Sequence, residues 1–310
     1  MMKELEVDER LTDGLPAILS QFPPLVTGMI VLEKSKEARL LRLAIFQAVS
    51  KLHTSELTVD QITGAQLAEL LGLTEDLNPP SFQPAQLTPG NIAQQKAGSY
   101  VASYLAAQFV DRLGKVGTPP QMIAELTVDG SDYLLAQVQR LQFNFNQNFR
   151  IADYLADLKA RAGLLAKISA KQGAVLAKQG PEVISLAGQV GQSLGTAAAI
   201  IDELREVDQN QEWFDSAVTA GQYPLPLLFA IEQNSQWFKQ FFGQHHRPSR
   251  QQFAHAYDLS RSQLPAAFAI VNDLLSQIEL DIKVLPSGAS QQALVKLIEY
   301  LKTKEENVCD

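Results

Sequence analysis

The most regular hydrophobic pattern in the chain lies between residues 181 and 207. Its apolar residues recur at alternating steps of four and three, which places them on one face of an α-helix. They are Val183, Ala187, Val190, Leu194, Ala197, Ile201 and Leu204. Pro181 suits the first helical position, because the amide hydrogen that proline lacks would be unpaired there. The pattern predicts one long helix over residues 181–207.

A second stripe of small and acidic residues runs beside this apolar one. It contains Gly188, Gly191 or Gln192, Gly195, and Ala198 or Ala199, and it ends in Asp202 and Glu206. The small residues predict a groove that ends in carboxylates, and two acids four residues apart on a helix can converge on one cation. The alternative interpretation is a helix that leaves the core and becomes acidic where it meets water.

Similar patterns predict helices along most of the chain. A helix is expected over 38–53, another after the capping residue Thr58 as far as Gly72, and a third from Gly90 through 113. Further helices are expected over 120–142, 151–179, 264–282 and 291–301. The proline-rich stretch 74–89 predicts a loop, and 142–149 predicts a bent helix or short connection. No segment shows β alternation between turn signals, so the chain is predicted to be all-α, with residues 1–310 forming a single domain.

Composition limits the classes of function. A net charge of −8 and a pI near 5.1 argue against non-specific binding to nucleic acid or to an anionic membrane. Cys309 is the only cysteine, which excludes a disulfide framework and a cysteine metal site and suits a reducing compartment. No segment approaches the roughly 18 continuous apolar residues of a membrane span, and the acidic start is unlike a signal peptide. We therefore expect a cytoplasmic protein without a transmembrane segment.

The order of residues around Asp202 carries a family resemblance. The stretch LGTAAAIIDELRE is similar to the second aspartate-rich segment of the trans-polyprenyl diphosphate synthases, LGxAFQIxDDxxD. The matching residues are Leu194, Gly195, Ala197, Ile200 and Asp202. Glu203 and Glu206 stand where the family has Asp, and Ala198-Ala199 stand where it has Phe-Gln.

The first aspartate-rich segment of that family, HTASLIHDDxxD, is matched less well. His53, Thr54, Leu57 and Asp60 fit its frame. Gln61 and Gly64 replace the other two aspartates, and neither binds Mg²⁺ as a carboxylate does. One carboxylate of three is retained, so this metal site is interpreted as lost.

Other family positions are also altered. Ser99 replaces the Asp of GNxxxxxxGDY, in which Gly90 and Gly98 are expected to allow close helix packing. Arg161 stands where the family lysine contacts diphosphate, although a cation on a helix surface is often only solvated. Gln222 replaces the Lys of GKxTLPLL, and Pro24 is the only trace of the GKxxRP segment that grips isopentenyl diphosphate.

The resemblance implies a bundle of long antiparallel helices around a cavity, Mg²⁺ as cofactor, and a dimer formed through the N-terminal half. The family-equivalent metal ligands that remain are Asp60, Asp202, Glu203 and Glu206. The last three can still hold one divalent ion, but a three-metal cluster is not expected.

Three hypotheses of function follow. The first is a catalytically degenerate accessory or regulatory subunit of isoprenoid biosynthesis, acting as a homodimer or as a heteromer with an active prenyl diphosphate synthase. The second is an active geranylgeranyl or polyprenyl diphosphate synthase, which would have to work with those four acids. The third is a module that binds a lipid in its cavity without chemistry.

Overall fold

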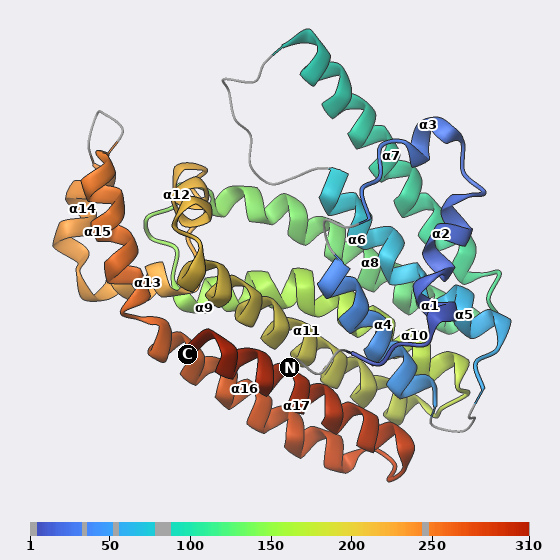
Figure 1. Cartoon of the computed structure of the whole chain (residues 1–310). Coiled ribbons are helices and arrows are strands. Elements are labelled where there is room, and N and C mark those ends of the chain that lie inside the picture. Colours follow the sequence, from blue (N-terminus) through green and yellow to red (C-terminus); the bar gives the residue numbers. More distant parts are fainter. Residues whose placement is uncertain (1–4, 33–35, 52–55, 78–87, 244–247, 310) are drawn as a thin grey trace.

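The computed structural model describes residues 5–32, 36–51, 56–77, 88–243 and 248–309, and it contains helices and no strand in these ranges (Figure 1). The all-α prediction is confirmed. The shorter N-terminal helices are α1 (Glu9–Thr12), α2 (Gly14–Leu19), α3 (Pro24–Thr27), α4 (Lys36–Ser50), α5 (Val59–Ala65) and α6 (Leu67–Leu77). The middle of the chain forms α7 (Pro89–Leu113), α8 (Pro120–Arg140), α9 (Ile151–Leu158), α10 (Leu164–Leu176) and α11 (Pro181–Gln209). The last part forms α12 (Gln211–Thr219), α13 (Leu225–Gln233), α14 (Ser235–Phe242), α15 (Arg250–Arg261), α16 (Leu264–Val284) and α17 (Ala289–Cys309).

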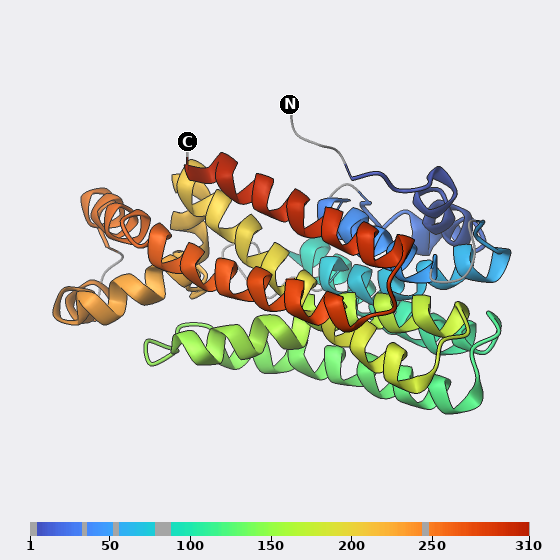
Figure 2. The ribbon, with the colours of Figure 1, turned by 90° about the horizontal axis from the view of Figure 1, so that it is seen from below.

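Helix α11 is the centre of the larger core. Six residues of its predicted apolar stripe are fully buried: Ala187, Val190, Leu194, Ala197, Ile201 and Leu204. Pro181 begins the helix, as predicted. Helices α10, α16, α17 and α4 all pack against α11, and Figure 2 shows α16 and α17 running side by side along it.

The predicted groove of small residues is instead filled by α10 and by the turn of helix that precedes it, Lys159–Gly163. A Cβ atom added to Gly195 would lie 2.8 Å from the carbonyl oxygen of Ala162, and one on Gly191 would lie 2.7 Å from that of Ala166. Such distances are shorter than real Cβ contacts, so glycine is needed for the two helices to approach this closely. The stripe is therefore a packing surface.

The N-terminal half has its own core between α6, α7 and α8. The four α7 residues predicted to be in phase, Val101, Leu105, Phe109 and Leu113, are buried there. A Cβ atom added to Gly98 of α7 would lie 2.9 Å from the carbonyl oxygen of Leu77, which confirms close packing at this glycine. Among the described residues, only Thr88 lies within 4 Å of a Cβ atom added to Gly90, so no close packing is seen there.

Several predicted boundaries differ from the structure. The helix expected from Thr58 to Gly72 is two helices, α5 and α6, which meet at Gln66. Residues 74–77 of the expected loop are helical, because α6 continues to Leu77, and residues 78–87 lie outside the described residues. The helix expected over 151–179 contains a π-helical turn over Lys159–Gly163, a feature that often marks functional positions.

Helix α11 is also the one described helix that is long and apolar enough to cross a membrane. Its most apolar window is 67% buried inside the protein. A mostly buried core helix passes the same test of length and composition.

Candidate functional site

Asp202 lies near the end of α11 and is held by the C-terminal helix. Its Oδ1 accepts a hydrogen bond from the ammonium group of Lys304 on α17, and the same ammonium lies 2.7 Å from Oε2 of Glu37 on α4. The Lys304 side chain is 6% exposed. Burial raises the pKa of Asp202, and the neighbouring Lys304 opposes that rise. Asp202 therefore has a cationic partner that is supplied by the chain itself.

Glu203 points to another neighbour. Its Oε1 accepts hydrogen bonds from the hydroxyl of Tyr154, at 2.8 Å, and from the backbone N–H of Leu225, at 2.7 Å. Leu225 begins α13, so Glu203 satisfies one of the unpaired N–H groups of that helix. Burial raises the pKa of Glu203. Glu206 accepts a hydrogen bond from the amide of Asn210, at 3.1 Å. Asp202, Glu203 and Glu206 thus each bind different partners within the chain.

Asp60 lies in the first turn of α5, which begins with a capping box formed by Thr58 and Gln61. The capping role of Thr58 is confirmed. Asp60 faces the turn between α7 and α8, where its carboxylate lies 3.4 Å from a Cβ built on Gly117.

The structure places α5 and Asp202 at different ends of α11. Gly64 of α5 contacts Leu176 and Gln172 of α10, and the adjoining part of α10, at Lys171, contacts Gly188 of α11. From that level to Asp202 is a rise of about 20 Å along the helix at about 1.5 Å per residue. Asp60 therefore does not face Asp202, and the acids that the resemblance assigns to metal binding are not brought together. His53 and Thr54 of the same predicted segment lie outside the described residues.

Arg161 belongs to the π-helical turn and is not simply solvated. Its Nη2 donates to Asp157 at 2.9 Å, and its Nη1 donates to Glu75 of α6 at 3.2 Å. Burial alone would lower the pKa of Arg161, but the hydrogen bond to Asp157 and the charge of Glu75 raise it. Two carboxylates therefore already neutralise the cation that the resemblance assigns to diphosphate.

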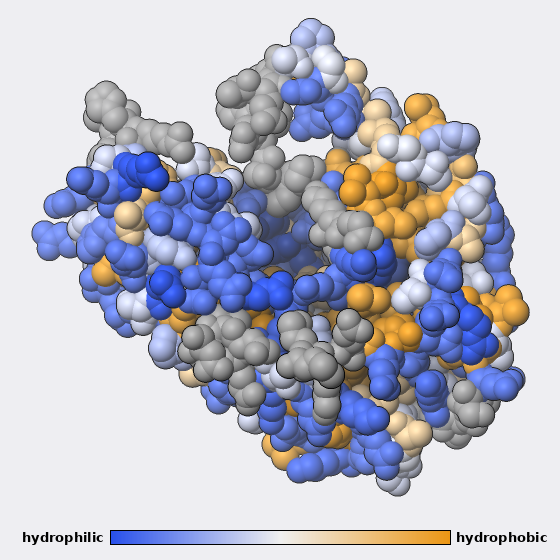
Figure 3. Space-filling model, viewed as in Figure 1, coloured by the Kyte–Doolittle hydropathy of each residue, from blue (hydrophilic) through white to orange (hydrophobic). Residues whose placement is uncertain are grey.

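This contact extends into a network, which we call the Arg161 network. Arg140 of α8 lies 3.7 Å from Asp157, and the Tyr133 hydroxyl donates to Glu75 at 3.3 Å. The residues of the network are Glu75, Tyr133, Gln137, Arg140, Asp157 and Arg161. On the face seen in Figure 3, the surface has a hydrophilic hollow between α6 and α12.

Sequence reasoning found Arg161 but missed the other members of this network. Asp157 precedes Arg161 by four residues, a spacing that predicts an ion pair on a helix. Glu75 comes from a segment that was expected to be loop, so its position gave no such signal.

Ser99 and Gln222, the two remaining residues predicted to bind substrate, do not belong to the Arg161 network or to the acidic segment of α11. Ser99 is exposed on α7, and its hydroxyl donates to the carbonyl oxygen of Gln95 at 3.2 Å. Gln222 lies in the connection between α12 and α13, where its backbone N–H donates to Ala217. The structure brings neither residue to Asp202 or Arg161 through a hydrogen bond between described residues.

The four predicted metal ligands do not fit one Mg²⁺ ion. Asp202 is paired with Lys304, Glu203 is engaged by two hydrogen-bond donors, and Asp60 is at a different level of the bundle. Within the described part of the chain, no group of three or more His, Cys, Asp or Glu residues is arranged to hold a metal ion. Mg²⁺ prefers near-octahedral sets of oxygen ligands, which these contacts do not supply.

Comparison with known proteins identifies the fold. No protein-family profile and no curated protein matches the chain by sequence. Among solved structures, it is similar to geranylgeranyl pyrophosphate synthase from Lactobacillus brevis, with a TM-score of 0.82 and 20% identity over 94% of this chain and 95% of that one. It is also similar to heptaprenyl diphosphate synthase from Staphylococcus aureus, with a TM-score of 0.75 and 19% identity over 95% of this chain and 96% of that one.

A third similar structure is the polyprenyl synthase from Caulobacter crescentus complexed with calcium and isoprenyl diphosphate. Its TM-score is 0.68 and its identity is 15%, over 96% of this chain and 98% of that one. That protein was solved with a divalent cation. The chain described here therefore has, over nearly its whole length, the isoprenoid synthase fold of the polyprenyl diphosphate synthases.

Proposed function

We propose that this protein is a catalytically degenerate accessory or regulatory subunit of isoprenoid biosynthesis. It works in the cytoplasm as one domain and pairs with an active prenyl diphosphate synthase. The observation that carries the proposal is the internal neutralisation of Arg161 by Asp157 and Glu75, and of Asp202 by Lys304.

Substrate and metal would have to displace contacts that the chain already makes with itself. Diphosphate can reach Arg161 only by replacing two carboxylates, one of which, Asp157, is 2% exposed. Removing the partner of a buried charge costs about 3–5 kcal/mol. Magnesium at Asp202 would similarly have to displace the buried ammonium of Lys304. A synthase site instead needs its cations and carboxylates free to take the charge of the leaving diphosphate.

An exposed stripe on α8 supports pairing with another chain. Residues 124, 128, 131, 135 and 138 follow steps of four and three, and Val128, Leu135 and Val138 among them are 59%, 53% and 59% exposed. We call Val128, Leu135 and Val138 the α8 stripe. Aligned exposed apolar side chains on one helix mark an interaction surface. Its place in the N-terminal half agrees with the dimer that the resemblance implies, as a homodimer or a heteromer.

Turnover measurements test the proposal. Purified protein is given Mg²⁺, isopentenyl diphosphate and an allylic diphosphate, alone and together with an active homologue. We expect no elongated product from the protein alone and a changed rate or product length in the mixture. Clear turnover by the protein alone that is abolished by Asp202→Ala would establish the active-synthase hypothesis instead.

Association is tested separately by pull-down from the native cell and by matched substitutions. Leu135→Glu is expected to abolish capture of the active synthase. Leu280→Glu is the control, because Leu280 is 55% exposed on α16, outside the stripe. Capture that Leu135→Glu leaves unchanged would contradict a role for the α8 stripe, and capture of this chain alone would contradict the heteromer. Lipid found by mass spectrometry without any effect on a synthase would favour the lipid-binding module.

A further inference from the structure

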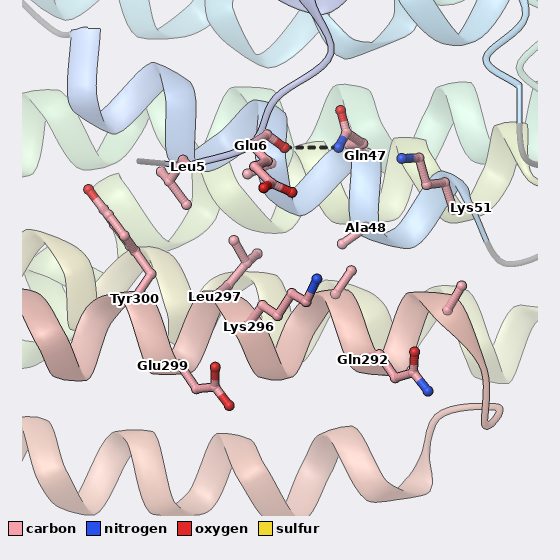
Figure 4. A pocket seen from close by; sticks show the side chains of 13 residues that line it. Leu5, Glu6, Gln47, Ala48, Lys51, Gln292, Lys296, Leu297, Glu299 and Tyr300 are labelled. Carbon is pink, nitrogen blue, oxygen red and sulfur yellow. Dashed lines mark hydrogen bonds between the residues drawn. The ribbon is translucent and has the colours of Figure 1, made fainter. Parts of the chain in front are cut away.

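A pocket of about 470 Å³ lies between the N-terminal segment, α4 and α17. Leu5 and Glu6 border it from the N-terminal segment (Figure 4). Helix α4 contributes Ala44, Gln47 and Ala48, and Lys51 follows the end of that helix. Its volume is in the range of sites that take small organic ligands. None of its lining residues belongs to the Arg161 network or to the acidic segments. It is therefore a separate site, and its occupancy does not depend on the proposed function.

The floor of the pocket is made by paired alanines. Ala44 and Ala48 are one turn apart on α4, and Ala289 and Ala293 are one turn apart on α17. Because these side chains are short, the two helices leave space between them where leucines would fill it. Leu297 and Tyr300 extend the apolar wall, and Figure 4 places them with Leu5 at one end. This end suits a hydrocarbon chain.

The other end carries cationic groups. Figure 4 shows Lys51 beside Gln47 at this end, with the side chain of Lys296 extending towards them. Neither lysine forms a salt bridge with a described residue, although the charge of Lys51 helps to lower the pKa of the nearby Asp8. Glu6 supplies one opposing carboxylate, and Glu299 lies on the side of α17 that faces α16 in this view. The pocket lining thus contains two lysines and two glutamates, and the two ammonium groups are its cationic part.

The N-terminal border is fixed in place by Gln47. Its Nε2 donates to the carbonyl oxygen of Glu6 at 3.1 Å, the dashed contact in Figure 4, and its Oε1 accepts from the N–H of Asp8 at 2.7 Å. These two bonds hold the segment over the pocket between α4 and α17. The pocket is thus pre-formed, which lowers the entropic cost of binding.

We propose that this pocket binds a single-chain amphiphile with an anionic head group. The head group lies near Ala48 and Ala293 and contacts Lys51 and Lys296. The hydrocarbon chain extends from there past Leu297 towards Tyr300 and Leu5. The head is a carboxylate or a phosphate, as in a fatty acid or an isoprenoid phosphate. Burial of the chain supplies the affinity, and the two ammonium groups select the sign of the head.

Isothermal titration calorimetry with three probes of equal chain length tests this assignment. The probes are dodecanoate, dodecyl phosphate and dodecyltrimethylammonium, each kept below its micellar concentration. The two anions are expected to bind with one-to-one stoichiometry, and the cation at least tenfold more weakly. Equal binding of all three, or no binding of the anions, would overturn the proposal.

Variants locate the site. Lys51→Gln combined with Lys296→Gln is expected to weaken anion binding at least tenfold. The control pair Lys239→Gln and Lys283→Gln removes the same charge from α14 and α16 and is expected to leave binding unchanged. Ala293→Phe is expected to abolish binding by filling the floor, with thermal unfolding used to check that the variant is folded. Anion binding that survives both pocket variants would place it elsewhere.

Native mass spectrometry separates the two natural sources. Protein incubated with a total lipid extract is expected to retain one ligand, whose mass identifies a carboxylate or a phosphate. A diacyl phospholipid or a neutral lipid as the retained ligand would contradict a single-chain anion. Failure of these binding tests would leave the turnover and pull-down results of the proposed function unaffected.

Discussion

Replacing Lys304 by methionine removes the cation that holds Asp202 while keeping most of the buried side-chain stem. The ammonium of Lys304 contacts both Asp202 and Glu37, and the lysine side chain is 6% exposed. Loss of one partner of a fully buried pair costs about 3–5 kcal/mol. Here the side chains of Asp202 and Glu37 are 34% and 48% exposed and can regain water, so we expect a smaller loss, about 2 kcal/mol.

The same substitution is expected to create a response to Mg²⁺. With Lys304 gone, Asp202 and Glu37 are left as two carboxylates without their shared cation, a site that attracts a divalent ion. If the dissociation constant is about 1 mM, about 10 mM Mg²⁺ stabilises the variant by about 1.4 kcal/mol. The parent protein should show no such gain, because Lys304 already occupies the position between the two acids.

The assay is urea unfolding followed by circular dichroism, with and without Mg²⁺. Lys302→Met is the matched control, since Lys302 lies on the same helix and pairs with Glu279 at the surface. That pair is worth less than about 1 kcal/mol. The reasoning is refuted if the two variants lose equal stability, or if Mg²⁺ stabilises the parent as much as Lys304→Met.

Two further substitutions test the packing of α11 and the burial of a tyrosine. Gly195→Ala should lower the free energy of unfolding in urea by about 1–3 kcal/mol. The reason is that the new Cβ atom would lie 2.5 Å from the Cβ atom of Ala166 on α10. Gly180→Ala, with nothing within 4 Å, should change stability by less than about 0.5 kcal/mol, and equal effects would contradict the packing argument. Burial raises the pKa of Tyr223 to about 12, so its phenol stays protonated in the folded protein while the unfolded one ionises above pH 10.0. The protonated phenol therefore contributes its full stabilisation below pH 10.0, and this contribution is lost as the pH rises through about 12. Tyr223→Phe has no phenol to ionise, so across that window its free energy of unfolding should rise by about 2 kcal/mol relative to that of the parent. Parallel alkaline unfolding curves for parent and variant would show that the phenol is not protected.

Local patterns were enough to predict much of the fold. The apolar stripe of α11 and the positions of Val101 and Leu105 on α7 depend on helical periodicity, which is visible within a few turns of sequence. The break between α5 and α6 was not predictable in the same way. Gln66 is buried there and donates to the carbonyl oxygen of Leu11, a contact with a segment 55 residues away. That residues 1–310 form a single domain stays a prediction, and so does the dimer.

The candidate site was predicted less well because its chemistry depends on distant partners. Lys304 lies 102 residues after Asp202, and Glu75 lies 86 residues before Arg161, so neither pairing leaves a local signal. Asp60 was placed by matching a short motif, and the motif could not show that α5 packs near the other end of α11. The sequence also predicts that scaffold residues are kept while diphosphate-binding charges are replaced, and this stays a prediction.

The most direct test of the central claim is the rate of prenyl transfer by the purified protein alone. Radiolabelled isopentenyl diphosphate, an allylic diphosphate and Mg²⁺ are supplied, and elongated product is extracted and counted against a reaction without protein. Because Arg161 and Asp202 are neutralised within the chain, we predict no product above that background. Sustained, Mg²⁺-dependent turnover that disappears with Asp202→Ala would contradict the account.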